Sequence, residues 1–279
     1  MPSLYIPSFS EKRIVAQSRG ADSCAPNLWR GCVFAAPLDE PGGLTAFDVS
    51  GYRNNGTLTS MDAATDHVVT PMGRVLDFDG DDDRVVLPAS SVLKVPLPIT
   101  VSVWAKPTGV TAMQRIFRND NFGVVYLGLV TSIYISRLYC DFGDGTGGNR
   151  RGGHSGAVLT SGVWQHWVWD IRGAENMAFY LNAKSVAMEY DGTGGAMAYS
   201  AGAGAIGNFG DETQNFLGQL ALLTIHSRIL RPSEILRLYT DPGGMYRLRR
   251  RVQVRGAAVG TTIRWPWQLR RHRRMAGAR

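Results

Sequence analysis

Hydrophobic and polar residues alternate in short runs along most of the chain between about Gly31 and His226. The runs are rich in Val, Ile, Tyr, Phe and Trp, and clusters of Gly, Asp, Asn and Pro separate them, as is typical of β-strands joined by turns. Strands are predicted at residues 31–38, 84–87, 99–106, 123–130, 132–141, 163–171, 177–181 and 219–226. Many short strands of this kind favour an all-β, antiparallel two-sheet sandwich.

The strand at residues 99–106 illustrates the alternation. Ile99, Val101 and Val103 share one face, whereas Trp104 lies on the other face among polar residues. An aromatic ring beside polar groups suits carbohydrate recognition, so Trp104 is a candidate ligand-binding residue. The alternative is an aromatic residue on an outer sheet face that another segment covers.

One short helix is predicted at residues 232–239, after the last strand. Pro232 suits the first helical position, and the apolar residues Ile235, Leu238 and Tyr239 form a short stripe. A helix of this length depends on packing against the sandwich.

The chain divides by composition into three segments. Residues 1–28 are predicted to be an N-terminal arm, residues 29–243 the sandwich, and residues 244–279 a C-terminal arm. Within the sandwich, the glycine-rich stretches 140–156 and 190–207 are predicted to be long loops at its edge.

Six blocks of sequence, in order, resemble the laminin-G-like branch of the concanavalin-A-like lectin and glucanase superfamily, of the kind found in bacteriophage virion proteins. They are residues 37–59, 75–88, 99–108, 161–169, 179–186 and 205–239. The resemblance implies a jelly-roll sandwich. Many relatives have an acidic pair that supports a calcium ion where this chain has Ala221 and Leu222.

The sequence gives no indication of a membrane-spanning or exported protein. No apolar run reaches the roughly 18 residues that a membrane-spanning helix needs, and the N-terminus lacks the pattern of a secretory signal peptide. Cys24, Cys32 and Cys140 are too few for a disulfide framework, which fits folding in a reducing cytoplasm.

Positive charge is concentrated at the C-terminus. The formal net charge is +7, and residues 245–279 contain eleven arginines with no lysine and no acid, which leaves residues 1–244 at −4. Unpaired arginines beside tryptophans predict an arm that docks on an acidic partner. The alternative is a solvated tail of biased composition. The predicted docking residues are Arg249, Arg250, Arg251, Arg255, Trp265, Trp267, Arg270 and Arg271.

Catalytic patterns are missing from the sequence. No strand carries the paired carboxylates of a glucanase, no Gly-rich loop continues into Gly-Lys-Ser/Thr, and no histidines are spaced for zinc. The protein is therefore predicted not to be an enzyme. Aspartates near two turns, Asp48, Asp79 and Asp81, are candidate ligands of Ca²⁺, a cation that prefers oxygen ligands.

These observations favour a structural or adhesive virion protein of a tailed bacteriophage, a capsid decoration, spike or tail-associated protein, assembled in the host cytoplasm. Its expected partners are other virion proteins or copies of itself, and a host surface glycan. The alternative is a bacterial secreted or surface carbohydrate-binding, lectin-like module. Nucleic-acid binding through the basic tail ranks third, because the rest of the chain is acidic.

Overall fold

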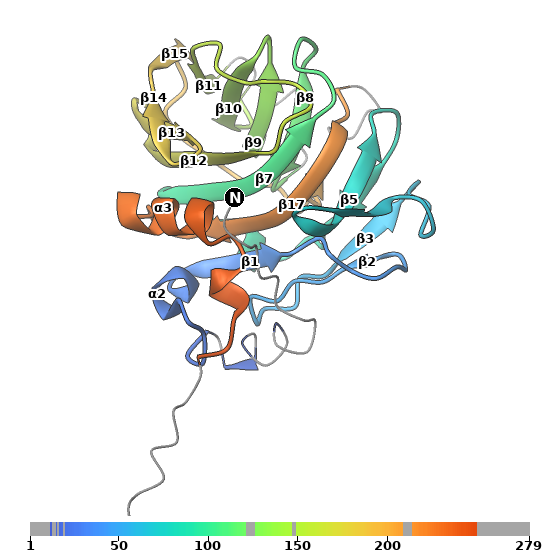
Figure 1. Cartoon of the computed structure of the whole chain (residues 1–279). Helices are drawn as coiled ribbons and strands as arrows, with labels where there is room; N and C mark the ends of the chain where they lie inside the picture. Colours follow the sequence, from blue (N-terminus) through green and yellow to red (C-terminus); the bar gives the residue numbers. More distant parts are fainter. Residues whose placement is uncertain are drawn as a thin grey trace, which may run out of the picture. The chain divides into compact units, whose positions relative to one another are not determined.

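The computed structural model describes Lys12, Val15 and residues 17–18, 20–120, 126–146, 149–208 and 214–249. Nearly all regular structure in this part is β, arranged as two antiparallel sheets (Figure 1). The predicted all-β sandwich is confirmed.

One sheet has eight strands in the order β14-β13-β12-β7-β17-β5-β4, with β1 paired to the second half of β17. A bulge in β17 between Ala221 and Thr224 separates the part that pairs with β5 from the part that pairs with β1. The strands are β1 (Cys32–Ala36), β4 (His67–Thr70), β5 (Gly73–Asp79), β7 (Ile99–Pro107), β12 (Gln165–Gly173), β13 (Asn176–Leu181), β14 (Lys184–Val186) and β17 (Leu217–His226).

The other sheet has nine strands in the order β15-β11-β10-β9-β8-β16-β6-β3-β2. They are β2 (Thr45–Ala46), β3 (Gly56–Thr59), β6 (Arg84–Val86), β8 (Gln114–Arg118), β9 (Leu127–Tyr134), β10 (Arg137–Asp144), β11 (Arg150–Ser155), β15 (Met188–Gly192) and β16 (Ala205–Ile206).

The main core lies between the two sheets and is built from the inward residues that alternation predicts. Ile99, Val101 and Val103 of β7 are fully buried in it. Two tryptophans of β12, Trp167 and Trp169, also lie there and meet edge to face, with ring centroids 6.3 Å apart. Aromatic rings of this size supply much of the apolar area that a sandwich must bury.

A second apolar cluster covers the outer face of the eight-stranded sheet. It joins Val168 of β12 to helix α3 (Pro232–Thr240), helix α2 (Pro26–Trp29) and the short 3-10 helix η2 (Gly244–Tyr246). The predicted helix at residues 232–239 is thus confirmed. Another 3-10 helix, η1 (Ser91–Leu93), precedes β7. Among the described residues, no helix has the length and apolar character that crossing a membrane requires.

Residues on both sides of the predicted sandwich boundaries belong to this second cluster. The ring of Trp29 meets that of Tyr246 edge to face at 5.9 Å, and its Nε1 donates to the carbonyl of Met245. Ser23 forms a bridge with Leu248, and Arg249 donates its N–H to the carbonyl of Asp22 at 2.6 Å. The segments at residues 20–29 and 244–249 are therefore packed on the sandwich and on each other.

The glycine-rich stretch at residues 140–156 was predicted to be a loop, and this prediction is wrong. Its two ends form the β10–β11 hairpin. In the other glycine-rich stretch, residues 193–204 contain no strand, but β15 and β16 occupy its ends. Glycine is ordinarily weak in strands, and here a Cβ at Gly153 would lie 2.7 Å from the sulfur of Met177, which would have to move.

The single strand predicted at residues 132–141 is a tight hairpin in the structure. Its turn is formed by Ile135 and Ser136, with φ of 48° and 59°. A β-branched residue rarely adopts positive φ, so the sequence gives no turn signal at this point.

Candidate functional site

Trp104 lies on the outer face of the eight-stranded sheet, as its place in the strand predicts, but helix α3 covers it. Its ring stacks on that of Tyr239 with centroids 5.7 Å apart and an interplanar angle of 10°, and it meets the His166 ring at 5.4 Å in a tilted arrangement of 32°. Its Nε1 donates to the carbonyl of Leu238, and the residue is 8% exposed. The ring joins helix to sheet and presents no face to a sugar.

Asp48 organises a turn in the structure. Its Oδ1 accepts hydrogen bonds from the N–H groups of Ala35 and Ser50, and its Oδ2 accepts one from Asn54 at 2.9 Å. Main-chain donors thus occupy both carboxylate oxygens, and this residue is buried. This is the local bonding by which aspartate stabilises turns.

The other predicted calcium ligands lie at the β5–β6 turn. Asp79, Asp82 and Asp83 each have a carboxylate oxygen within 4.8 Å of the others, whereas Asp81 donates its N–H to Asp79 Oδ1 at 2.8 Å. Burial, together with the neighbouring carboxylates, raises the pKa of Asp83 to about 6. The cluster of three differs from the predicted set, because it includes neither Asp48 nor Asp81.

We expect EDTA to shift the melting temperature of the protein by less than about 2 °C. A bound ion stabilises the folded state by an amount that grows with the logarithm of its concentration relative to Kd. The three turn carboxylates offer one mutually close oxygen each, and Asp79 Oδ1 and Asp83 Oδ2 already accept main-chain N–H groups, whereas Ca²⁺ takes six to eight oxygens. Thermal unfolding with EDTA, and again with excess Ca²⁺, measures the effect. A drop above about 10 °C that Ca²⁺ reverses would contradict this expectation.

One residue of the predicted docking arm lies in the described part of the chain. Arg249 is described, and its main chain bonds to Asp22. The other predicted residues, Arg250, Arg251, Arg255, Trp265, Trp267, Arg270 and Arg271, lie outside the described residues.

A different group of residues comes together on the outer face of the nine-stranded sheet. Five neighbouring strands form this part of the sheet, β15, β11, β10, β9 and β8 (Figure 1). The pairing between neighbouring strands aligns their outward-facing residues in rows across the sheet. One row is Glu189, His154, Tyr139, Ser132 and Arg115, and the next is Asp191, Gly152, Asp141, Val130 and Arg118. We call the surface formed by Arg115, Tyr134, Arg137, Tyr139, Asp141, Arg150, His154, Glu189 and Asp191 the Tyr139 face.

Three rings form the aromatic part of the Tyr139 face. The ring centroids of Tyr139 and His154 are 5.0 Å apart, and those of Tyr139 and Tyr134 are 6.0 Å apart. All three residues are half-buried, so each keeps some contact with solvent. The exposed Ile135 follows Tyr134 at the tip of the β9–β10 hairpin.

Next to the rings, arginine and aspartate alternate across the strands. Arg150 binds Asp141 through Nη1 and Asp191 through Nη2, the latter at 3.1 Å. Arg115 approaches Asp141 from the other side at 3.7 Å. Burial raises the pKa of the Asp141 carboxyl, and the Arg150 and Arg115 guanidiniums oppose that rise. The result is a continuous ladder of opposite charges.

Gly152 leaves the space that this ladder needs. It lies between Asp191 and Asp141 in its row, and a Cβ there would lie 1.8 Å from Asp191 Oδ1 and 2.8 Å from Asp141 Oδ1. Any side chain at this position would therefore displace the two carboxylates. The glycine that suggested a loop in the sequence makes room for the ladder.

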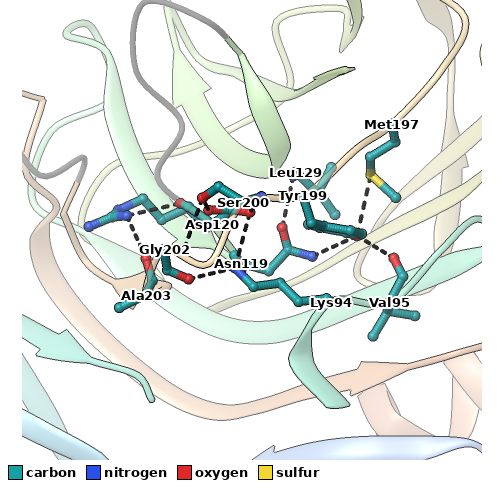
Figure 2. A network of polar contacts seen from close by, with 11 residues as sticks. Lys94, Val95, Asn119, Asp120, Leu129, Met197, Tyr199, Ser200, Gly202 and Ala203 are labelled. Carbon is teal, nitrogen blue, oxygen red and sulfur yellow. Dashed lines mark hydrogen bonds and ion pairs between the residues drawn. The ribbon is translucent and has the colours of Figure 1, made fainter. Parts of the chain in front are cut away.

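A second polar cluster lies at one end of the same sheet, and Figure 2 shows its contacts. The ammonium of Lys94 donates to the carbonyls of Asn119 (2.9 Å) and Gly202 (2.6 Å) and lies 3.1 Å from Asp120 Oδ2. Asp120 is fully buried and also accepts the N–H and hydroxyl of Ser200. These bonds fasten the segment around residue 200 to the end of β8 and are structural.

Sequence reasoning did not identify the Tyr139 face. A signal was present, because Arg137, Tyr139 and Asp141 alternate in one strand and Arg150, Gly152 and His154 in the next. Their convergence depends on the register between β10 and β11, which composition does not reveal.

Comparison with known proteins supports the fold. A family model described as the concanavalin A-like lectin/glucanases superfamily matches residues 79–236. A comparison with curated proteins found no match.

Solved structures similar to this chain share its fold at low identity. The receptor-binding domain of botulinum neurotoxin mosaic serotype C/D is 14% identical with a TM-score of 0.57, over 75% of this chain and 50% of that one. Domain 4 of AbnA, an arabinanase from Geobacillus stearothermophilus, in complex with arabinotriose, is 17% identical with a TM-score of 0.50, over 75% and 98%. Trypanosoma rangeli sialidase in complex with sialic acid is 12% identical with a TM-score of 0.53, over 77% and 33%. The chain thus spans about half of the neurotoxin domain and a third of the sialidase.

Proposed function

The chain belongs to the concanavalin A-like lectin/glucanases superfamily, and from this premise we propose that it is a lectin-like module that binds carbohydrate on the Tyr139 face. The observation that carries the proposal is the group of rings of Tyr134, Tyr139 and His154 beside the charged ladder. Domain 4 of AbnA, which is similar in fold, is solved in complex with arabinotriose, and this supports a carbohydrate as the class of ligand.

The face offers the two kinds of contact that a sugar uses. A pyranose or furanose ring has an apolar C–H surface that packs on an aromatic ring, and hydroxyls that need fixed donors and acceptors. Tyr139 supplies the first at the centre of the face. The carboxylates of Asp191 and Glu189, with exposed side-chain fractions of 41% and 76%, supply acceptors at its rim.

The proposed role is binding without catalysis. Hydrolysis of a glycoside requires one carboxyl group that delivers a proton and a second that acts as base or nucleophile. Asp141 and Asp191 are the two acids of the ladder, and Arg150 binds both of them. Held in this way, neither carboxylate is poised to donate a proton to a leaving group.

Replacing Tyr139 with alanine tests the proposal. The full chain is screened on a glycan array, and the affinity for the strongest ligand is measured by calorimetry. We expect Tyr139→Ala to weaken binding at least about 10-fold, which corresponds to roughly 1.4 kcal/mol, because the ring that packs on the sugar is lost.

Tyr52→Ala is the matched control, because Tyr52 is 46% exposed and lies outside the Tyr139 face. It should bind as the unchanged protein does. Equal binding by the Tyr139→Ala variant and the control would overturn the proposed site, and a protein that binds no glycan would overturn the proposed function.

The setting expected from the sequence, a structural or adhesive virion protein of a tailed bacteriophage, stays a prediction. Mass spectrometry of purified particles tests it, because a virion protein must be present in them in fixed copy number.

A further inference from the structure

We infer that the Tyr139 face selects uncharged glycans over glycans that carry carboxylate, sulfate or phosphate groups. This inference rests on the proposed function and deepens it. The observation behind it is that the fixed charges of the face neutralise one another. Its three guanidiniums are those of Arg115, Arg137 and Arg150, and its three carboxylates are those of Asp141, Asp191 and Glu189.

The two arginines of the ladder, Arg115 and Arg150, already bind other side chains of the protein. Arg150 directs one nitrogen to Asp141 and the other to Asp191. Arg115 donates from Nε to Gln214 and from Nη1 to Ser132, both at 2.8 Å, and lies beside Asp141. Recognition of an anionic sugar uses bidentate bonds from a guanidinium. For Arg115 and Arg150 such a bond would require an existing ion pair to break.

Acidic residues at the rim add to the selectivity. The side chains of Glu189 and Asp191 are the more exposed charges of the face, with 76% and 41% exposed, compared with 28% for Arg150. An anionic sugar over the rings would therefore meet like charges first. Juxtaposed like charges suppress binding of the wrong partner.

An uncharged sugar meets no such penalty and finds both donors and acceptors. The Asp191 carboxylate, whose side chain is 41% exposed, can accept, and the half-buried Arg137 guanidinium, whose Nη1 lies 3.3 Å from His154 Nδ1, can donate. They lie on strands β15 and β10, on either side of the strand that carries His154. One acceptor and one donor that flank an aromatic group suit sugar hydroxyls, which both donate and accept.

The first experiment compares ligand classes with the full chain. A glycan array carries uncharged, sialylated, uronate-containing and sulfated oligosaccharides, and the affinity for the best ligand is measured at about 0.05 M and 0.5 M NaCl. We expect the strongest ligands to be uncharged and their affinity to change less than about 2-fold with salt, since screening acts on charge pairs. Acidic glycans as the strongest ligands, with affinity that falls steeply with salt, would overturn the inference and leave the proposed function standing. Binding of no glycan would overturn both.

The second experiment changes the charge balance. Asp191→Asn removes one carboxylate from Arg150 at nearly constant shape and should raise the affinity for acidic glycans at least about 10-fold relative to the unchanged protein. The matched control is Glu175→Gln, which removes a carboxylate 3.0 Å from Arg151. Arg151 pairs with Phe142 and alternates with the residues of the Tyr139 face, so it lies outside that face. The control should leave selectivity unchanged. Unchanged selectivity in the Asp191→Asn variant, or an equal gain in the control, would contradict the role of charge balance.

Discussion

Truncating the chain after Gly244 is expected to lower the free energy of unfolding by about 5 kcal/mol or more. The cut removes Met245 and Tyr246, which are 1% and 0% exposed, and large-to-small changes at buried residues of this size each cost roughly 2–5 kcal/mol. It also removes the carbonyl that accepts from Ser23 Oγ and from Trp29 Nε1. The N-terminal segment therefore loses its main support.

Thermal unfolding measures this effect against a matched truncation after Arg249. For a domain of this size each kcal/mol corresponds to about 2–4 °C, so the shorter protein should melt at least about 10 °C lower. The longer one keeps the contacts that residues 244–249 make with the rest of the described chain and should melt close to the full chain. Equal melting of the two truncated proteins would show that η2 does not stabilise the fold. The docking role predicted for the arginine-rich arm is therefore best tested by the cut after Arg249, which leaves the sandwich intact.

Replacing Lys94 with methionine is expected to cost about 3–5 kcal/mol. The substitution keeps an unbranched side chain one atom shorter and takes a positive charge away from the Asp120 carboxylate, which is fully buried. Removing one partner of a buried ion pair is costly because the remaining charge has little solvent to stabilise it.

A double variant separates the loss of charge balance from the loss of packing. In Lys94→Met/Asp120→Asn the buried carboxylate is gone, while an amide oxygen can still accept the hydroxyl of Ser200. We expect this variant to be more stable than Lys94→Met alone by about 2 kcal/mol or more in denaturant unfolding. A Lys94→Met protein within about 1 kcal/mol of the unchanged one would show that the pair in Figure 2 contributes little.

The sequence predicts those parts of the fold whose signals are local. The alternation of Ile99, Val101 and Val103 gives the inner face of β7, and Pro232 marks the start of α3. The hairpin turn at Ile135 was missed because its residues disfavour the conformation they adopt. Strand β11 was missed because Gly152 and Gly153 weaken a strand on their own, although packing requires them.

The candidate site was harder to predict because it depends on contacts between distant segments. The alternation of residues along the strand predicts which face of the sheet carries Trp104. The Tyr239 ring that covers Trp104 belongs to a helix much later in the chain, and alternation gives no information about it. Aspartates were chosen for their density in the sequence, whereas Asp141 and Asp191 are brought together by the pairing of β10, β11 and β15. Register between strands carries this information, and a single sequence gives it only weakly.

The bridge between Ser23 and Leu248 has a consequence for how the module can be built into a larger polypeptide. Ser23 and Leu248 bring together two points near the beginning and the end of the described chain, so the module could be inserted into a surface loop of a host protein, or circularly permuted, with little distortion. These points adjoin the cluster that covers the outer face of the eight-stranded sheet, whereas the Tyr139 face is the outer face of the opposite sheet. In a host protein joined to the module at this position, the rings of Tyr134, Tyr139 and His154 would lie on the side of the module that faces away from the junction.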